Sequence, residues 1–286
     1  YKVIALYSSE IDKLEQLKNL VPKGLELSFD AVLSFEKEDL EALIKNVMAQ
    51  GWDIKEVIAG AETGVALCDL LSEALNLRTN NSAQSEVRRN KYRMGETIRN
   101  AGVRAVRQLR SSDWNEIETY LTTWNPSPFK CIVKPLESAG SDNVTLCNSF
   151  DEARDAFDAI CGQRNILGLL NEAVLVQEFL EGQEFVVDMV SRDGVHKCVA
   201  VWQYDRRAVN GAGFVCFGQH LLTVADDPRV LPLVEYQKKV LTALGINNGP
   251  SHGEVKWFNG EPCLVEVGAR CHGAEGFWVS VADAVH

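Results

Sequence analysis

Residues 252–270 read HGEVKWFNGEPCLVEVGAR. Two apolar runs flank the pair Asn259-Gly260, and this spacing predicts an antiparallel hairpin with a tight turn. Each predicted strand carries one carboxylate, Glu254 in the first and Glu266 in the second. Glu266 stands among apolar residues, where burial of an unpaired carboxylate is costly. The stretch therefore predicts a cation close to this side chain.

The register of this hairpin decides whether the two carboxylates can meet. With a two-residue turn, Glu254 lies opposite Val265, and Glu266 points to the other face of the sheet. One site cannot then contain both side chains. We therefore predict that either an odd-length loop, such as Asn259 to Glu261, or a β-bulge restores the parity.

The chain divides into three parts by its pattern of strands and helices. Residues 1–85 alternate short β-like runs with helical patterns, including a predicted helix at 11–21, which indicates a parallel βαβ unit. Residues 86–172 predict a small mixed subdomain, and residues 173–286 an antiparallel-rich subdomain. The fold class is therefore α/β combined with α+β. Because the chain stops soon after residue 270, we expect the third part to be truncated.

The first part of the chain contains one candidate ligand-binding turn and ends in a polar segment near residue 85. A turn at 60–64 follows a predicted third strand at 57–59, where open α/β sheets bind ligands, although a plain strand-to-helix turn remains an alternative. The polar residues 78–85 interrupt the alternation and are typical of a linker. We expect the domain boundary there.

Composition excludes several classes of protein. The 286 residues are 46% hydrophobic and 24% charged, as in folded globular proteins. A net charge of −11 argues against nucleic acid or an anionic membrane as a partner. The eight cysteines form no C-x-x-C pair, which indicates reduced thiols and a cytoplasmic location. No apolar run approaches the roughly 18 residues that span a bilayer.

Six short segments occur in a fixed order over the chain, and together they resemble the ATP-grasp superfamily, in particular its L-amino-acid ligase branch. They are NKYRM (90–94), VKP (133–135), ESAGSDNV (137–144), VQEFLEGQE (176–184), HGEVK (252–256) and VEVGAR (265–270). The resemblance implies an ATP-grasp fold. It also implies ATP as cofactor with Mg²⁺, or alternatively Mn²⁺.

The phosphate contacts follow from this resemblance. Lys134 ends an apolar strand, is fixed by the proline after it, and matches the lysine that meets the α-phosphate. Lys91 matches a second phosphate lysine. A glycine-rich lid corresponds to Ser138, Gly140 and Ser141, whose backbone N–H groups can approach phosphate oxygens. A snorkelling strand-end lysine and a solvated helix face remain alternatives for the two lysines.

The adenosine contacts are expected on residues 176–184. By resemblance, Gln177 and the carbonyl of Glu178 accept from the adenine amino group, the N–H of Leu180 reaches N1, and Glu184 holds the ribose hydroxyls. Gln177 and Glu178 are neighbours on a strand, so only one of their side chains can face the ring. A strand with solvated glutamates is the alternative.

Metal and reaction chemistry are expected on the hairpin of residues 252–270. Glu254 and Glu266 match metal ligands, and carboxylate oxygens suit Mg²⁺. The family's third ligand is an asparagine where this chain has Gly268, so the third coordination point is open. Arg270 matches an arginine that stabilises a tetrahedral oxyanion, with a salt bridge as the alternative. His272 is a weaker candidate for substrate contact.

Residues 204–213 are expected to form a long loop between two strands. Loops of this length often cover active sites. We expect Arg206 or Arg207 in it to bind substrate carboxylate or the γ-phosphate.

These observations predict an ATP-dependent carboxylate–amine ligase that works through an acyl phosphate and releases ADP and phosphate. Lys134 and Arg270 are the expected catalytic residues, and the partners are a small carboxylate and a small amine, with a homodimer as one option. A carboxylase or purine-pathway enzyme of the same superfamily, or a non-catalytic ATP-binding module, is the alternative.

Overall fold

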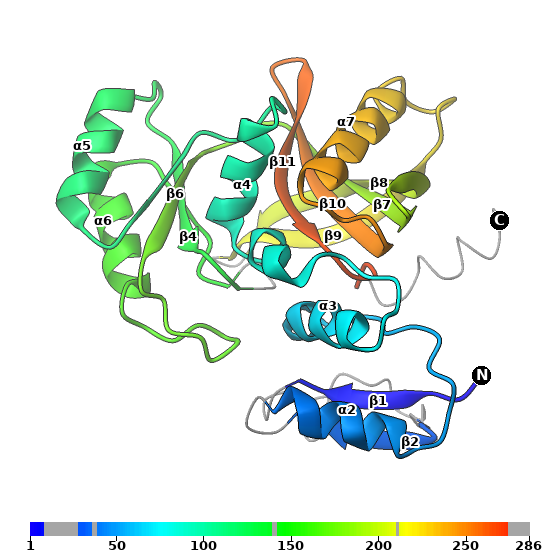
Figure 1. Ribbon diagram of the computed structural model, residues 1–286. Coiled ribbons are helices and arrows are strands. Elements are labelled where there is room, and N and C mark those ends of the chain that lie inside the picture. The colour runs from blue at the N-terminus through cyan, green and yellow to red at the C-terminus, as the bar shows by residue number, and fades with distance from the viewer. Residues whose placement is uncertain (9–27, 36–38, 139–141, 210–211, 274–286) are drawn as a thin grey trace.

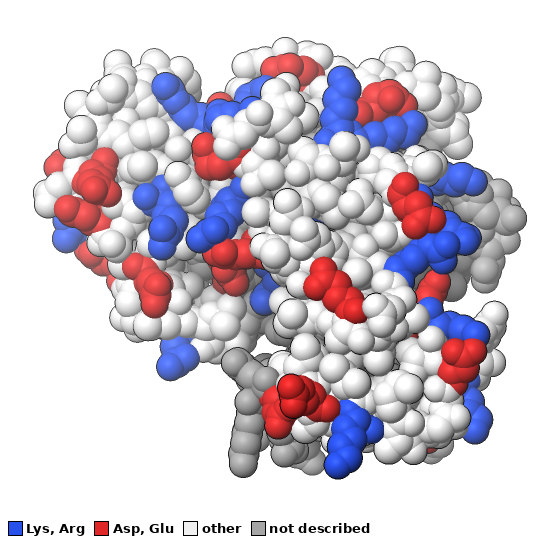
Figure 2. Space-filling model, in the orientation of Figure 1, with Lys and Arg blue, Asp and Glu red and all other residues white. Residues whose placement is uncertain are grey.

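The computed structural model describes residues 1–8, 28–35, 39–138, 142–209 and 212–273. These residues form three β-sheets with helices packed around them (Figure 1). In the described ranges, no helix is long and apolar enough to cross a membrane. On the face drawn in Figure 2, basic and acidic side chains are interspersed.

The first sheet pairs β1 (Ile4–Tyr7) with β2 (Ala31–Ser34) in parallel, as predicted. Helices α2 (Leu40–Met48) and α3 (Val65–Ala74) accompany it, and their buried leucine and valine side chains form its core. The predicted third strand at 57–59 is wrong. The carbonyl of Val57 accepts a hydrogen bond from the Cys68 thiol and joins no ladder. The helix predicted at 11–21 lies outside the described residues.

The predicted linker at 78–85 is a packed connection. It leads into a 3₁₀ helix, η2 (Ser82–Arg88), whose last residue is fully buried. The Arg88 guanidinium forms an ion pair of 2.8 Å with Asp69 of α3 and donates to the carbonyl oxygen of Leu244 at 3.2 Å. In Figure 1, α3 lies between the first sheet and the rest of the molecule. Within the segment itself, the Asn80 side chain accepts hydrogen bonds from the backbone N–H groups of Asn247 and Asn248, so its polar residues also make internal contacts.

The second sheet is antiparallel and has the order β3-β6-β4-β5. Its strands are β3 (Gln108–Ser111), β4 (Cys131–Pro135), β5 (Thr145–Cys147) and β6 (Val174–Glu178). Helices α5 (Trp114–Trp124) and α6 (Phe150–Ile160) lie together beside it (Figure 1), and they share a hydrophobic core with its strands. Although the predicted boundary at 173 grouped β6 with the later strands, β6 pairs with β3 and β4.

The third sheet has five antiparallel strands in the order β11-β10-β7-β8-β9. They are β7 (Gln183–Arg192), β8 (Val195–Val209), β9 (Ala212–Leu222), β10 (Gly249–Phe258) and β11 (Glu261–Gly268). The antiparallel prediction for this region is confirmed. Helices α4 (Lys91–Asn100) and α7 (Val230–Ala243) contribute to the largest buried cluster with these strands.

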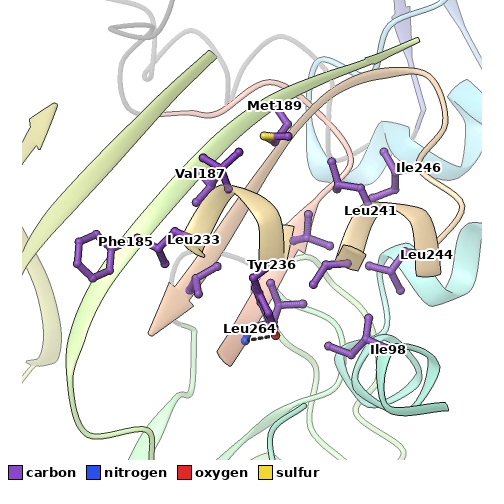
Figure 3. Packing of buried hydrophobic residues seen from close by; sticks show 14 of the residues in the cluster. Ile98, Phe185, Val187, Met189, Leu233, Tyr236, Leu241, Leu244, Ile246 and Leu264 are labelled. Atoms are coloured by element: carbon purple, nitrogen blue, oxygen red, sulfur yellow. Dashed lines mark hydrogen bonds between the residues drawn. The ribbon is translucent and has the colours of Figure 1, made fainter. Parts of the chain in front are cut away.

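Figure 3 shows how α7 fixes the edge strand β11. Leu233 and Leu241 of α7 lie among apolar side chains of the sheet. The Tyr236 hydroxyl accepts a hydrogen bond from the backbone N–H of Leu264 at 2.8 Å and donates to the carbonyl of Arg104 at 2.7 Å. This hydroxyl therefore satisfies a backbone donor on the outermost strand.

The long loop predicted at 204–213 is wrong. Strand β8 continues to Val209 and β9 begins at Ala212, so most of this segment is a β-ribbon. Two irregularities, after Asp205 and after Arg207, interrupt the pairing without ending it. Because side chains alternate on a strand, the ribbon directs neighbouring polar residues to opposite faces.

Candidate active site

A cavity with about 840 Å³ of space lies between the second and third sheets. Apolar residues form part of its wall, including Val106, Ile132 and Leu264. Charged side chains from α4, β4, β7, β8, β10 and β11 line the remainder. An apolar slot beside convergent charges suits a ligand with a flat ring and an ionic tail.

The hairpin of β10 and β11 places its two carboxylates directly opposite each other. Asn259 and Gly260 form the two-residue turn, with φ angles of 53° and 85°, as a type I′ turn requires. The register shifts by one residue next to Glu254, so that Glu254 pairs with Glu266. The β-bulge prediction is therefore confirmed, and Val265 is the extra residue.

Two lysines surround this carboxylate pair. The Lys91 ammonium forms an ion pair of 2.7 Å with Glu266 and donates to the carbonyl oxygen of Ser138 at 3.0 Å. Lys134 is only 4% exposed; its burial and the nearby Lys91 charge lower its pKa to about 8. The site thus holds two ammonium groups beside the two carboxylates.

The two carboxylates differ in their electrostatic surroundings. Burial, followed by the charges of Glu266 and Glu184, raises the pKa of Glu254. Burial also opposes ionisation of Glu266, but the ammonium groups of Lys91 and Lys134 hold its pKa below the usual value. The two facing carboxylates supply the hard oxygen donors that a divalent cation such as Mg²⁺ takes. Within the described part of the chain, no third His, Cys, Asp or Glu converges with them as a metal ligand.

The other end of the cavity contains the residues expected to contact adenine. Gln177 is buried and donates to the Gln108 side chain at 2.9 Å. The Glu178 carboxylate accepts hydrogen bonds from the guanidinium of Arg104 at 3.1 Å, so this side chain is used within the protein. Across the described ranges, the N–H of Leu180 has no hydrogen-bond acceptor. All three predicted residues line the cavity.

Four charged side chains that line the cavity interact with one another. Glu184 forms ion pairs with Arg206 at 2.9 Å and with Lys256 at 3.2 Å. Arg206 also lies 3.9 Å from Glu254 and thus connects the two acidic groups. Lys256 was not predicted as a site residue. The signal was its position two residues after Glu254, because alternate residues of a strand share one face.

A second cavity, with about 490 Å³ of space, adjoins the first and shares Lys91, Ser138, Glu254 and Glu266 with it. Arg270 lines this second cavity and forms an ion pair of 2.9 Å with Glu62. Glu62 belongs to a 3₁₀ turn, η1 (Glu62–Gly64), in the first part of the chain. The turn at 60–64 therefore reaches the site, and its carboxylate was not recognised as a site residue.

Two predicted substrate residues lie away from both cavities. Arg207 is exposed on the other face of β8, where it pairs with Asp205 and lies over the Phe217 ring. His272 is buried and hydrogen-bonded to the Tyr204 hydroxyl at 2.6 Å. In this arrangement neither Arg207 nor His272 faces a cavity in which it could contact substrate. The predicted lid residues Gly140 and Ser141 lie outside the described residues.

Gly268 occupies the position of the expected third metal ligand. A Cβ atom at this residue would overlap the imidazole of His252. That imidazole stacks on His272 with ring centroids 5.2 Å apart. The space for a side chain at Gly268 is thus taken by the buried His252 ring.

Comparisons with known proteins agree with this geometry. A family model described as the ATP-grasp domain matches residues 127–276. Dapdiamide A synthase of Enterobacter agglomerans is 35% identical over 236 residues, which cover 82% of this chain and 54% of that protein. Alanine–anticapsin ligase of Bacillus subtilis (strain 168) is 25% identical over 255 residues, 83% of this chain and 52% of that protein. The chain thus spans about half the length of these curated relatives.

Solved structures show the same fold. An L-amino acid ligase from Bacillus licheniformis superimposes with a TM-score of 0.69 at 19% identity, covering 97% of this chain and 69% of that structure. A D-alanine–D-alanine ligase from Bacillus anthracis gives a TM-score of 0.67 at 14% identity, covering 99% and 91%. At such identities the likeness concerns the fold alone.

Proposed function

Because this chain belongs to the ATP-grasp family, we propose that it is an ATP-dependent carboxylate–amine ligase that forms an amide bond through an acyl phosphate. One observation supports this most directly. The bulged hairpin brings Glu254 and Glu266 face to face beside Lys91 and Lys134, at the junction of the two cavities. The two relatives described above are named as a synthase and a ligase, which supports the same chemistry.

The first cavity suits ATP and the second suits the reacting partners. Adenine would lie in the apolar slot against Leu180, with its edge on the backbone of residues 178–180. Its phosphates would extend toward Lys134 and Lys91. Glu254 and Glu266 would hold Mg²⁺, which supplies charge neutralisation for phosphoryl transfer when bound.

The proposed reaction places each step on a residue of this junction. The substrate carboxylate attacks the γ-phosphorus, the bond to the β–γ bridging oxygen breaks and ADP leaves, and the two lysines stabilise the charge that spreads over the phosphoryl oxygens. A deprotonated amine then attacks the acyl carbon, and the Arg270 guanidinium stabilises the tetrahedral oxyanion. The carbon–oxygen bond to the phosphoryl group breaks, and phosphate and the proton lost by the nitrogen are released. Arg270 must exchange its contact with Glu62 for this oxyanion.

All eight cysteines are free thiols, which supports a cytoplasmic location for the reaction.

Incubation with ATP, Mg²⁺ and pairs of amino acids tests this proposal. We expect release of ADP and phosphate only when both an acid and an amine are present, with a condensed product visible by mass spectrometry. Phosphate release that depends on bicarbonate would indicate a carboxylase instead. ATP binding without turnover in any mixture would contradict the ligase proposal.

A matched pair of variants tests the role of the hairpin carboxylates. Glu266→Gln should lower kcat by about 100-fold or more, because the amide cannot neutralise a divalent cation. Glu235→Gln alters an exposed carboxylate on α7 that pairs with Lys238, and it should leave kcat unchanged. If the two variants have equal kcat values, Glu266 has no role in the reaction.

A further inference from the structure

The second cavity contains one arginine that has no acidic partner in the described structure. The other cations of this cavity are compensated. Arg88 pairs with Asp69 at 2.8 Å, Lys91 with Glu266 at 2.7 Å, and Arg270 with Glu62 at 2.9 Å. Arg89 lines the same cavity, and within the described ranges no carboxylate lies within ion-pairing distance of its guanidinium.

Arg89 is held in place by its backbone. It lies between η2 and α4, where its N–H donates to the carbonyl of Glu86 at 3.2 Å. Its side-chain Nε is buried and, in the described part of the chain, finds no acceptor. A buried N–H without an acceptor is costly, and the planar guanidinium fork matches the geometry of a carboxylate. An anion that arrives with a ligand would supply the acceptor that this guanidinium lacks.

The proposed reaction at the junction of the cavities indicates which group of the substrates this anion can be. The carboxylate of the acid substrate is consumed when it becomes an acyl phosphate and then an amide. The phosphoryl group is bound by the two lysines and by the cation that Glu254 and Glu266 would hold. The oxyanion is stabilised by Arg270. If the amine substrate carries a carboxylate, that group does not react and stays charged throughout. It needs a separate cation on the side of the junction away from the nucleotide.

We propose that Arg89 binds the unreacted carboxylate of an amino-acid nucleophile, and that this contact lets the site distinguish an amino acid from a simple amine. This inference rests on the proposed ligase function. It makes Arg89 a specificity-determining residue: it stabilises the amino acid before and during amide formation, without contact with the reacting carbonyl. A compound with a neutral carboxamide in place of the carboxylate loses this interaction.

The test compares amine substrates that differ only in this charge. With a fixed acid substrate, KM is measured for each active L-amino acid and for its carboxamide, using wild type, Arg89→Met and Arg89→Lys. We expect Arg89→Met to raise KM for the amino acid about 10- to 100-fold, as for loss of a charge-assisted hydrogen bond. The KM for the carboxamide should stay the same, and Arg89→Lys should recover part of the loss. Arg93→Met is the matched control, because that arginine is exposed on α4 and pairs with Glu86.

Other outcomes separate this inference from the function on which it rests. If wild type condenses amino acids but Arg89→Met leaves KM for the amine unchanged, or raises KM for ATP or the acid instead, the inference is wrong and the ligase proposal stands. If wild type shows no turnover, calorimetry with L-amino acids in the presence of Mg²⁺ and a non-hydrolysable ATP analogue still tests it. Equal binding by wild type and Arg89→Met would then overturn it.

Discussion

The most consequential single residue after the carboxylate pair is His252, which is 5% exposed. It lies on the same strand face as Glu254, and its Nδ1 lies 3.3 Å from the carbonyl oxygen of Arg270. Burial, followed by the charges of Arg270 and His272, lowers its pKa from 6.5 to about 4. The imidazole is therefore neutral in the folded protein at physiological pH.

This shift predicts how stability depends on pH. Because the folded-state pKa lies below the unfolded value, the unfolded chain binds the proton more readily between pH 6.5 and 4. The free energy of unfolding should fall by about 3 kcal/mol from this residue alone as the pH decreases through that window. Urea denaturation at several pH values, without divalent cations, measures it. His252→Gln should have a shallower pH dependence than wild type; parallel curves would show that His252 does not contribute.

At the scale of elements, the connection between β6 and β7 links the second sheet to the third. It includes Leu180, one of the residues expected to contact adenine. Gly182 lies in this connection, and a Cβ atom there would overlap the backbone carbonyl of Trp257 on β10. The Lys256 ammonium also donates to the carbonyl oxygen of Gly182, at 3.3 Å. The connection therefore packs against β10 with no room for a side chain.

Gly182→Ala should push this connection away from β10. We expect a loss of about 2 kcal/mol in unfolding free energy, because a backbone carbonyl cannot rotate aside, and a higher KM for ATP. Thermal denaturation and ATP titration measure the two effects. Gly218→Ala is the control, since no atom lies within 4 Å of a Cβ at that position. Similar stability of the two variants would contradict the close approach.

The same scale shows what the sequence could predict. Alternation and turn residues fix the hairpin of β10 and β11, and the need to unite Glu254 with Glu266 implied its bulge. The ribbon at 204–209 was missed because the segment between the two predicted strands is too long for a tight hairpin turn, which suggested a loop. Its charges are satisfied on two faces, by Glu184 for Arg206 and by Asp205 for Arg207. Such compensation depends on partners that strand alternation alone does not identify.

At the scale of the whole molecule, a buried ion pair joins the first part of the chain to the remainder. Arg88 is fully buried and contacts Asp69 of α3, the carbonyl of Asn81 and the carbonyl of Leu244. One side chain thus joins three separate segments. Contacts over such distances, like Glu62 with Arg270, have no local signature in the sequence. This explains why the sequence analysis found the six motifs but not the residues that connect them to the first part.

Arg88→Met should destabilise the protein by about 3–5 kcal/mol, because it leaves the Asp69 charge buried without a partner. The double variant Arg88→Met/Asp69→Leu removes both charges and should recover much of the loss. Chemical denaturation of the single and double variants gives both values. If the double variant is as unstable as the single one, packing and the backbone hydrogen bonds of Arg88, not charge burial, dominate.

A side chain at position 268 would overlap the His252 ring, so substitutions at positions 252 and 268 must occur in a particular order. A side chain can enter at 268 only after the ring at 252 has been reduced, so these two positions cannot vary independently. Gly268→Asn in the present background should lower the melting temperature, whereas the same change should be tolerated in a His252→Ala background. A melting temperature for the double variant below that of either single variant would argue against this dependence. An evolutionary path that alters the ligands of this site must therefore pass through position 252 first.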